Sequence, residues 1–321
     1  MTDEQGIPDG RCFGGSCFGR WMAEGFAVAL FMLFFVISGT VQAQQLEPRT
    51  YMPAPIDLNI IGLSTLYSRG GVVTDVASPI QNINADVYTV APYYARTFGL
   101  FGRQANVSLV TPYAWGTITG DVQDVSRSVD RSGFGDPTVR LTMNLIGGPA
   151  MTPQEFRQRE SETILGASVT VNAPFGQYDS SKLINLGANR WAVKPELGLS
   201  QPVGDWVLEF YTGVWLFETN DNFFGGQVRK QDPLGVFQTH IVYNVLPGLW
   251  AAVDFAYYTG GSTTVNGKPQ NDRQDNTRGG LTLSVPITRG QSLKLAWARG
   301  VSTRVGSSFE TVAVAWQLMW F

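Results

Sequence analysis

The chain ends on Thr311-Val312-Ala313-Val314-Ala315-Trp316-Gln317-Leu318-Met319-Trp320-Phe321, and this stretch decides the fold class. Successive side chains of a β-strand point to opposite faces, so an alternating stretch of this kind predicts an amphipathic strand. Gln317 interrupts the apolar face that we expect to lead up to the terminal Phe321. The sequence therefore predicts that the chain finishes in a strand with one apolar and one polar face.

The position of this strand at the very end of the chain adds a second clue. A terminal aromatic residue that closes an amphipathic strand resembles the signal that the barrel assembly machinery recognises in the outer membrane of bacteria. If the chain is a transmembrane β-barrel, the rest of it should contain further short segments of alternating polarity.

Such segments recur from residue 56 to the end, separated by stretches rich in turn residues. In a barrel one face of each strand contacts lipid and the other faces the lumen, so apolar and polar residues alternate along the strand. The fold class that we predict is all-β: a transmembrane antiparallel β-barrel of about twelve strands. The segments are 56–68, 84–98, 104–119, 135–147, 162–174, 190–202, 206–218, 234–246, 249–262, 277–287, 291–301 and 309–321.

Charged residues gather on one face of these segments. In 190–202, Lys194 and Glu196 lie on the face opposite Leu197 and Leu199. We assign the charged face to the lumen, where it either lines a path for solute or holds the barrel rigid by ion pairs. The predicted lumen residues are Arg140, Lys194, Glu196, Glu209, Tyr211, His240, Asp254, Arg278 and Lys294.

The connections alternate in length. Short turns at 203–205, 247–248 and 288–290 alternate with long polar loops near 120–134, 175–189, 220–232 and 263–276. Short periplasmic turns and long external loops are typical of barrels inserted from the periplasm. The connection 148–160 is long where a short one is due, and we expect a small helix around 153–159.

Aromatic residues cluster at the predicted strand ends, as in the two girdles of outer-membrane barrels. Trp206, Trp250, Trp320 and Phe321 fall at the periplasmic rim, and Trp115, Trp191, Phe217 and Tyr258 at the outer rim. Asp121, Asp124 and Asp130 fall in the predicted loop 120–134, but their spacing does not match a calcium-binding EF-hand, so we expect a solvated loop there.

The N-terminus has the features of an export signal. Arg11 and Arg20 precede an apolar run of roughly 12 residues that is too short for the ~20 residues of a membrane-spanning helix. Val41 and Ala43 fit the residues that signal peptidase accepts, so we expect residues 1–43 to be a cleaved signal peptide and 44–321 to be the barrel. Met22 is an alternative start that leaves the mature chain unchanged.

Composition excludes several classes of function. The net charge of −3 gives no sign of a nucleic-acid partner. The two cysteines, Cys12 and Cys17, both lie in the leader, so the mature chain has neither a disulfide nor a thiolate metal site. With His240 as the one histidine, a His-cluster metal site is excluded too. We expect no metal and no cofactor.

Catalysis would have to run through His240. The outer-membrane phospholipases, also twelve-stranded barrels, place a nucleophilic serine two residues after their histidine, on the outside of the barrel. Here that position is Val242, and His240 falls on the face assigned to the lumen. We therefore expect a protein that is not an enzyme.

Two motifs in the middle of the chain carry a family resemblance. Asn172-Ala173-Pro174-Phe175-Gly176-Gln177-Tyr178-Asp179 leads to Asn185-Leu186-Gly187-Ala188-Asn189-Arg190-Trp191, and Phe134-Gly135-Asp136-Pro137 lies upstream. With these residues the chain resembles the transporters of the MetA-pathway of phenol degradation family, from about residue 56 onward. The resemblance implies a barrel that passes hydrophobic compounds across the outer membrane.

The motif residues have a structural and a functional interpretation. They either shape the long loop after the fifth strand or form a gate for solute, and Arg190 would bridge that loop to the lumen wall or to lipopolysaccharide phosphate. Phe223 and Phe224 would either line an apolar path or insert among the outer headgroups. The loop and gate candidates are Tyr178, Asp179, Asn185, Arg190, Phe223 and Phe224.

The sequence thus predicts an outer-membrane channel that passes small molecules, aromatic or hydrophobic ones among them, by passive diffusion. Its expected partners are membrane lipid, lipopolysaccharide, the assembly machinery and small hydrophobic solutes. Two alternatives stay open: an outer-membrane hydrolase, and a non-conducting structural or assembly barrel of a surface complex.

Overall fold

The computed structural model describes residues 46–73, 80–122 and 125–321. The expected signal peptide, residues 1–43, and its cleavage site lie outside the described residues. Among the described residues, no helix is long and apolar enough to cross a membrane.

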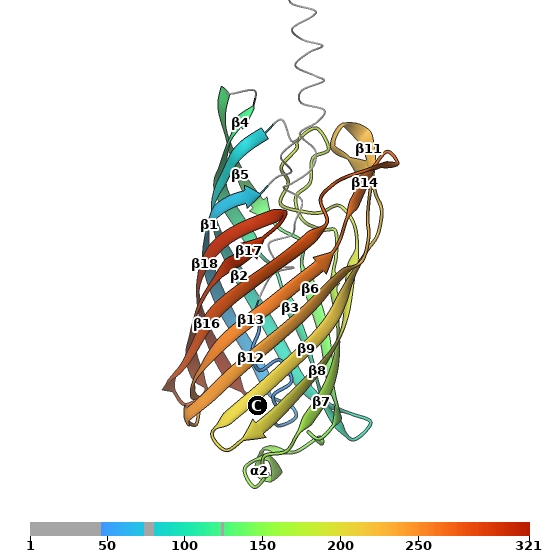
Figure 1. Ribbon diagram of the computed structural model, residues 1–321. Coiled ribbons are helices and arrows are strands. Elements are labelled where there is room, and N and C mark those ends of the chain that lie inside the picture. The colour runs from blue at the N-terminus through green and yellow to red at the C-terminus, as the bar shows by residue number, and fades with distance from the viewer. Residues whose placement is uncertain (1–45, 74–79, 123–124) are drawn as a thin grey trace, which may run out of the picture.

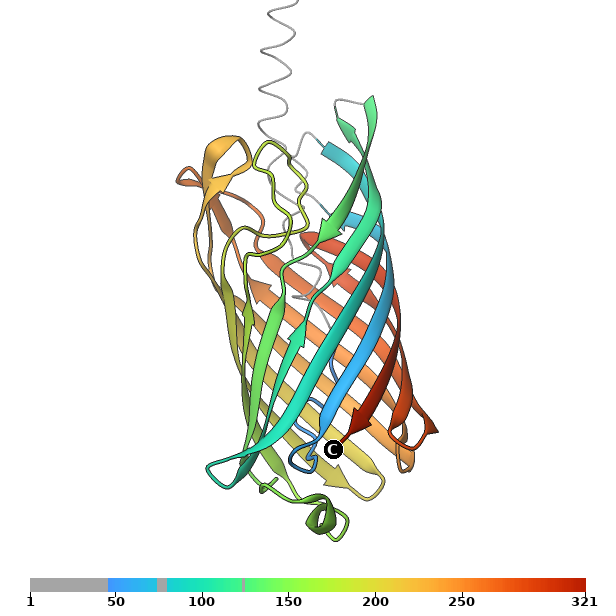
Figure 2. The same ribbon diagram turned by 180° about the vertical axis from the view of Figure 1, so that it is seen from behind.

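One antiparallel sheet of fourteen strands closes into a barrel (Figures 1 and 2). The first strand, β1 (Asn59–Val73), pairs with β2 (Ile80–Leu100) on one side and with the last strand, β18 (Gly306–Trp320), on the other. Twelve strands form the ring, because β4 and β5 branch from it as a hairpin. The other ring strands are β3 (Arg103–Val110), β6 (Thr138–Ile146), β7 (Ile164–Asn172), β8 (Ala192–Val203), β9 (Trp206–Phe217), β12 (Leu234–Leu246), β13 (Leu249–Gly260), β16 (Gln274–Thr288) and β17 (Gln291–Thr303).

Each ring strand overlaps one of the twelve predicted segments, so the predicted fold class is confirmed. The alternation explains why: Lys194 and Glu196 are buried in the lumen, whereas Leu197 and Leu199 are exposed on the outside. Closure removes the free sheet edges, so every ring strand is hydrogen-bonded on both sides.

The last strand corrects one expectation. Gln317 lies on the lumen face, where it accepts a hydrogen bond of 3.1 Å from the Tyr93 hydroxyl. The outer face of β18 is formed by the other phase of the alternation, including the exposed Val312 and Trp316. Gln317 therefore does not interrupt the apolar face.

The two ends of the barrel differ. The short turns β8–β9, β12–β13 and β16–β17 lie at one end together with the C-terminus, and we call this the turn end (Figure 1). The long β6–β7 connection lies there too and carries the expected helix, α2 (Pro153–Phe156). Thr152 caps it, and its side chain and that of Glu155 hydrogen-bond each other's backbone in a capping box. We call the opposite end the loop end.

The predicted loop 120–134 is wrong. Residues there form a hairpin of β4 (Tyr113–Val122) and β5 (Val125–Phe134) that extends the barrel wall at the loop end. Asp121 and Asp130 lie in these strands and accept hydrogen bonds from Asn82 and Thr117, while Asp124 lies outside the described residues.

Two prolines explain where this hairpin branches off. Pro112 separates β3 from β4, and Pro137 separates β5 from β6. Proline has no amide hydrogen for a sheet ladder, so it interrupts a strand. The strand that we predicted to start at Gly135 starts instead at Thr138.

A small second sheet lies at the loop end. It consists of β10 (Asn220–Phe223), β11 (Gln227–Gln231), β14 (Thr263–Val265) and β15 (Lys268–Pro269), with a 3-10 turn, η2 (Phe224–Gly226), between the first two. It joins the predicted loops 220–232 and 263–276 to each other.

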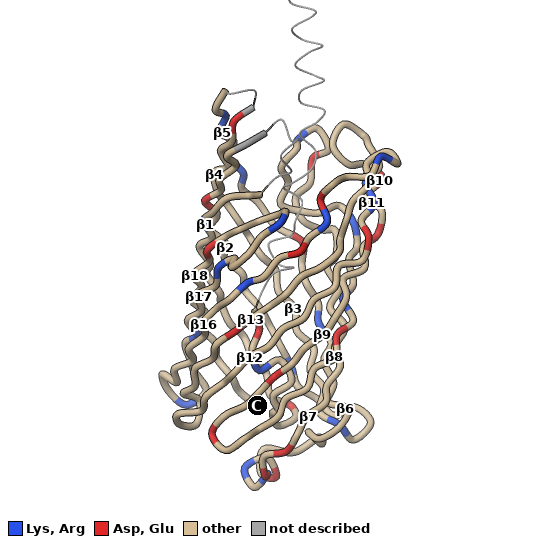
Figure 3. Tube along the Cα trace, in the orientation of Figure 1, with Lys and Arg blue, Asp and Glu red and all other residues tan. Residues whose placement is uncertain are grey.

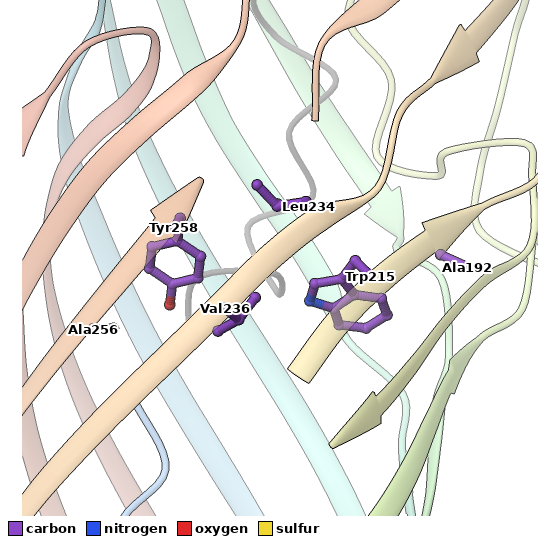
Figure 4. Close-up of a cluster of buried hydrophobic side chains, with 6 residues drawn as sticks. All are labelled: Ala192, Trp215, Leu234, Val236, Ala256 and Tyr258. Atoms are coloured by element: carbon purple, nitrogen blue, oxygen red, sulfur yellow. The ribbon is translucent and has the colours of Figure 1, made fainter. Parts of the chain in front are cut away.

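Three of the aromatic residues assigned to the girdles face the lumen instead. Tyr258 is fully buried in a cluster with Trp215, Leu234 and Val236 (Figure 4). Phe217 packs against the same cluster. The guanidinium of Arg49, a residue inside the barrel, lies over the ring of Trp250, 5.1 Å from its centre. Trp115, Trp191, Trp206, Trp320 and Phe321 are exposed on the outside.

Candidate functional site

The lumen at the turn end is occupied by residues 46–58, which precede the first strand. We call them the N-terminal segment. Its backbone and side chains reach several walls: the amide of Ala54 donates to Gln104 of β3, and Thr97 of β2 donates to the carbonyl of Pro55. Pro48, Pro53 and Pro55 keep this stretch from forming a strand of its own.

Charged groups fix the beginning of the segment. Glu47 forms an ion pair with Arg140 of β6. The backbone amide of Arg49 donates to Glu209 of β9 at 2.8 Å, and its guanidinium donates to Asn244 of β12 at 2.6 Å. Burial alone would raise the pKa of Glu47, but Arg140 and the nearby lysines outweigh it and lower the pKa to about 2.

Tyr51 holds the middle of the segment. Its ring lies on Gly166 of β7 and Gly198 of β8, which face each other across the two strands. A side chain at either glycine would overlap the ring, so glycine is required by this close approach. The Tyr51 hydroxyl is 3.1 Å from Ser168 and donates to Glu196 at 3.2 Å. Glu196 in turn pairs with Lys194 at 2.6 Å.

His240 lies next to this group. Its Nδ1 is 2.7 Å from Asp254, which also accepts a hydrogen bond of 2.7 Å from Thr282. The residues directly opposite His240 on the two neighbouring strands are Glu209 and Asp254, neither of which is a nucleophile for acyl transfer. Val242 shares the lumen face with His240, since both are buried. These neighbours do not supply the serine that the hydrolase alternative requires.

The structure thus brings most of the predicted lumen residues together around the N-terminal segment. Tyr211 packs edge-on against Tyr51, with 5.0 Å between ring centres. Arg278 lies higher in the barrel and donates to the carbonyl of Phe309. Lys294 is exposed, but its strand neighbours Ser284 and Ala315 are buried in the lumen, and its charge acts on Glu47 of the N-terminal segment.

Above the N-terminal segment the lumen becomes apolar. A cavity of about 230 Å³ lies between the barrel wall and the loop 173–191. The wall contributes Val72, Ala85 and Phe309, which belong to one buried cluster, and the loop contributes Leu183, Ile184 and Leu186. The lumen therefore has two layers, a polar one at the turn end and an apolar one at the loop end.

Asp136 anchors the loop that covers this cavity. It lies at the break between β5 and β6, and its two carboxylate oxygens accept from the amides of Gly176 and Ala188 at 2.9 and 2.8 Å. The three motif stretches of the sequence meet at this point. Their structural role is to hold residues 173–191 over the lumen.

The six gate candidates fall into four groups. The side chain of Asn185 accepts from the backbone amide of Asp179 and donates to its carbonyl, and these two hydrogen bonds stabilise the loop internally. Tyr178 contacts the small sheet through Asn220 and the carbonyl of Asn222. Arg190 is buried, donates to Gln231 of β11 in the small sheet and lies over the ring of Phe217 of β9.

The two phenylalanines complete the gate candidates. Phe223 is 3% exposed and packs against Val265, with Phe224 partly buried beside it. These rings therefore lie in the interior of the loop end, which disfavours the alternative that they insert among the outer headgroups.

Sequence reasoning missed Glu47, Arg49, Tyr51 and Asp136. The sequence does contain a signal for the first three. They stand in a proline-rich stretch, directly after the predicted leader, that contains both charged and large apolar residues. Asp136 lies within a recognised motif, but we expected a strand to start there. Its partners are backbone amides of the loop, and a backbone amide leaves no signal in the sequence.

Two solved structures place this fold. The chain resembles an outer membrane channel from Pseudomonas putida F1 with a TM-score of 0.71 and 21% identity, over 86% of this chain and 100% of that chain. It resembles the β domain of the Bordetella autotransporter BrkA with a TM-score of 0.52 and 10% identity, over 82% and 100% of the two chains. At these identities the likeness concerns the fold.

Sequence comparison identifies the family. No curated protein shows significant similarity to the chain. The family model described as "Putative MetA-pathway of phenol degradation" matches residues 68–318, which include β2 to β17 and the Asp136 anchor with its loop. The chain belongs to this family.

Proposed function

We propose that this protein is an outer-membrane channel through which small apolar molecules, aromatic ones in particular, diffuse passively. The observation that carries the proposal is the apolar cavity of about 230 Å³ inside a closed barrel. Water-filled channels are lined by polar side chains, whereas this wall is built from Val72, Ala85, Val87 and Phe309. The family to which the chain belongs supports the same class of solute.

The size of the cavity suits a single aromatic ring. An apolar cavity of roughly 150 Å³ is enough to hold benzene. Burial of apolar surface contributes about 25 cal/mol per Å², so such a ring gains a few kcal/mol on entry, by the same rule. This affinity is favourable enough for entry and weak enough for release, as a channel requires.

Passage to the turn end requires that the N-terminal segment move. Among the described residues it is held by the ion pairs Glu47–Arg140 and Asp57–Arg96, by hydrogen bonds to the wall and by the ring of Tyr51, and it forms no β-strand. We infer that the segment acts as a displaceable plug. His240 has no catalytic part in this proposal.

The same proposal assigns the cell biology. We infer that residues 1–43 export the chain, with cleavage after Ala43, and that the assembly machinery inserts the barrel with its loop end outward. The exposed apolar side chains on the outside of the strands then contact lipid and the acyl chains of lipopolysaccharide.

The test is uptake of a radiolabelled arene by intact cells that lack other arene channels, because apolar solutes cross simple lipid vesicles unaided. Ala85→Trp fills the cavity, whereas Tyr88→Trp, three residues along the same strand and exposed on the outside, leaves it open. We expect Ala85→Trp to reduce uptake at least tenfold and Tyr88→Trp to match the unmodified protein. Equal uptake by both variants, at equal amounts of folded barrel, would contradict the proposal.

A further inference from the structure

Two buried arginines, Arg190 and Arg229, lie near each other at the loop end. Arg190, at the end of the loop 173–191, is 5% exposed, and Arg229 of β11 is 7% exposed. Both line the apolar cavity. They belong to the loop-end region where Figure 3 shows charged positions around β10 and β11.

Their contacts leave donors unused. Arg190 donates to Gln231 and lies over Phe217, 4.5 Å from the ring centre. Arg229 lies over Phe223 at 5.2 Å. Among the described residues, Arg190 Nη1 and Arg229 Nε are buried without a hydrogen-bond partner.

The nearest carboxylates are already engaged. Asp136 accepts from the loop amides of Gly176 and Ala188. Asp272 accepts from the amide and hydroxyl of Thr263 at 2.8 and 2.6 Å. Within the described ranges, neither arginine has a carboxylate oxygen within 4.0 Å, so two guanidinium groups stay buried without a direct counter-ion.

This arrangement is costly unless a ligand completes it. A buried, unpaired charge is strongly unfavourable, and a guanidinium that lines a cavity is suited to bind a carboxylate through two parallel hydrogen bonds. Burial and the neighbouring Arg229 lower the pKa of Arg190 to about 9, so the group is still protonated at neutral pH.

We propose that Arg190 and Arg229 bind the carboxylate of a small aromatic acid whose ring occupies the apolar cavity. The inference rests on the proposed channel function and names a solute class within it. Phe217 and Phe223 flank the anion position, and the cluster around Phe309 faces the ring. Asp136 and Asp272 offset part of the positive charge, which favours a monoanion over a doubly charged phosphate.

The experiment measures benzoate binding to the purified, folded barrel by calorimetry at pH 7. Arg229→Gln and Arg190→Gln each remove one guanidinium, and Lys230→Gln removes an exposed charge from the same strand as Arg229. We expect benzoate affinity to fall at least tenfold in both arginine variants and to stay unchanged in Lys230→Gln. We also expect benzyl alcohol, a neutral molecule of similar shape, to bind all four proteins alike.

Equal loss of affinity in Lys230→Gln and Arg229→Gln would overturn the inference, as would benzoate affinity that survives both arginine substitutions. Displacement of benzoate by equimolar inorganic phosphate would overturn it too, since that result indicates a general anion site. Uptake of a neutral arene by cells tests the proposed channel independently of the acid site. If cells with the unmodified protein and cells with Arg229→Gln both take up the arene, but the unmodified protein does not bind benzoate, then the acid site is wrong and the channel is not.

Discussion

Tyr51 decides at the scale of single residues whether the N-terminal segment stays in the lumen. Its ring is 1% exposed, and its hydroxyl contacts Ser168 and Glu196. Because the ring is large and apolar and lies directly on two glycines, it contributes more to docking than any single polar contact of the segment.

Replacement of Tyr51 by alanine should therefore release the segment. We expect docking to weaken by about 3 kcal/mol, roughly a hundredfold in the ratio of docked to released segment. Planar-bilayer recordings should show larger and longer openings for Tyr51→Ala. Phe101→Ala, which removes an exposed aromatic ring in the turn between β2 and β3, should behave like the unmodified protein. Indistinguishable recordings for the two variants would show that Tyr51 does not hold the plug.

Glu47 makes docking depend on pH. The folded-state pKa of about 2 lies below the ordinary value of 4.5, because Arg140, Lys194 and Lys294 outweigh the effect of burial. The stabilisation from Glu47 is therefore complete above pH 4.5 and is lost as the pH falls toward 2. Conductance should rise over that window, and Glu47→Gln should conduct at pH 7 as the unmodified protein does near pH 2. Glu160→Gln, at an exposed position, serves as control. A conductance of the unmodified protein that does not change between pH 4.5 and 2 would show that Glu47 does not control docking of the segment.

At the scale of elements, the Asp136 carboxylate anchors the loop 173–191 through two backbone amides. Asp136 now accepts hydrogen bonds from two backbone amides, those of Gly176 and Ala188. In Asp136→Asn one of the two oxygens becomes an NH₂ group, which cannot accept from the amide that faces it. Loss of that charged hydrogen bond costs about 2 kcal/mol, or roughly thirtyfold in local opening. Hydrogen exchange of residues 175–189 should accelerate by that factor in Asp136→Asn.

Asp130→Asn is the matched control, because Asp130 accepts from a threonine hydroxyl in the exposed hairpin β4–β5. It should leave exchange in the loop unchanged, and both variants should keep the resistance of a folded barrel to detergent. If loop exchange is the same in both variants, Asp136 is not the anchor.

The elements also show what a sequence can reveal. All twelve ring strands were predictable because lipid on one side imposes apolar residues at every second position, as in Leu197 and Leu199. The hairpin β4–β5 was not, since it lies beyond that constraint and reads as a polar loop. The N-terminal segment was missed for a related reason: its partners Glu196, Glu209 and Arg140 are distant in sequence and carry no shared pattern.

At the scale of the whole molecule, the two layers of the lumen divide the work. The apolar layer at the loop end offers a place for a ring, with Arg190 and Arg229 at its margin. The polar layer at the turn end is filled by the N-terminal segment. In the proposed channel a solute passes both layers, so the proposal makes movement of the N-terminal segment the controlling step.

The measurement that tests this account most directly locks the segment in place. The only cysteines of the chain, Cys12 and Cys17, lie in the proposed signal peptide. A pair introduced as Arg49→Cys and Asn244→Cys, whose native side chains are 2.6 Å apart, can then be bridged by a short, reducible crosslinker. Arene uptake by intact cells is then recorded before and after a reductant is added, with each single-cysteine variant as control. The account predicts that crosslinked cells lose uptake and that reduction restores it. Uptake that is the same in both states would contradict passage through the lumen.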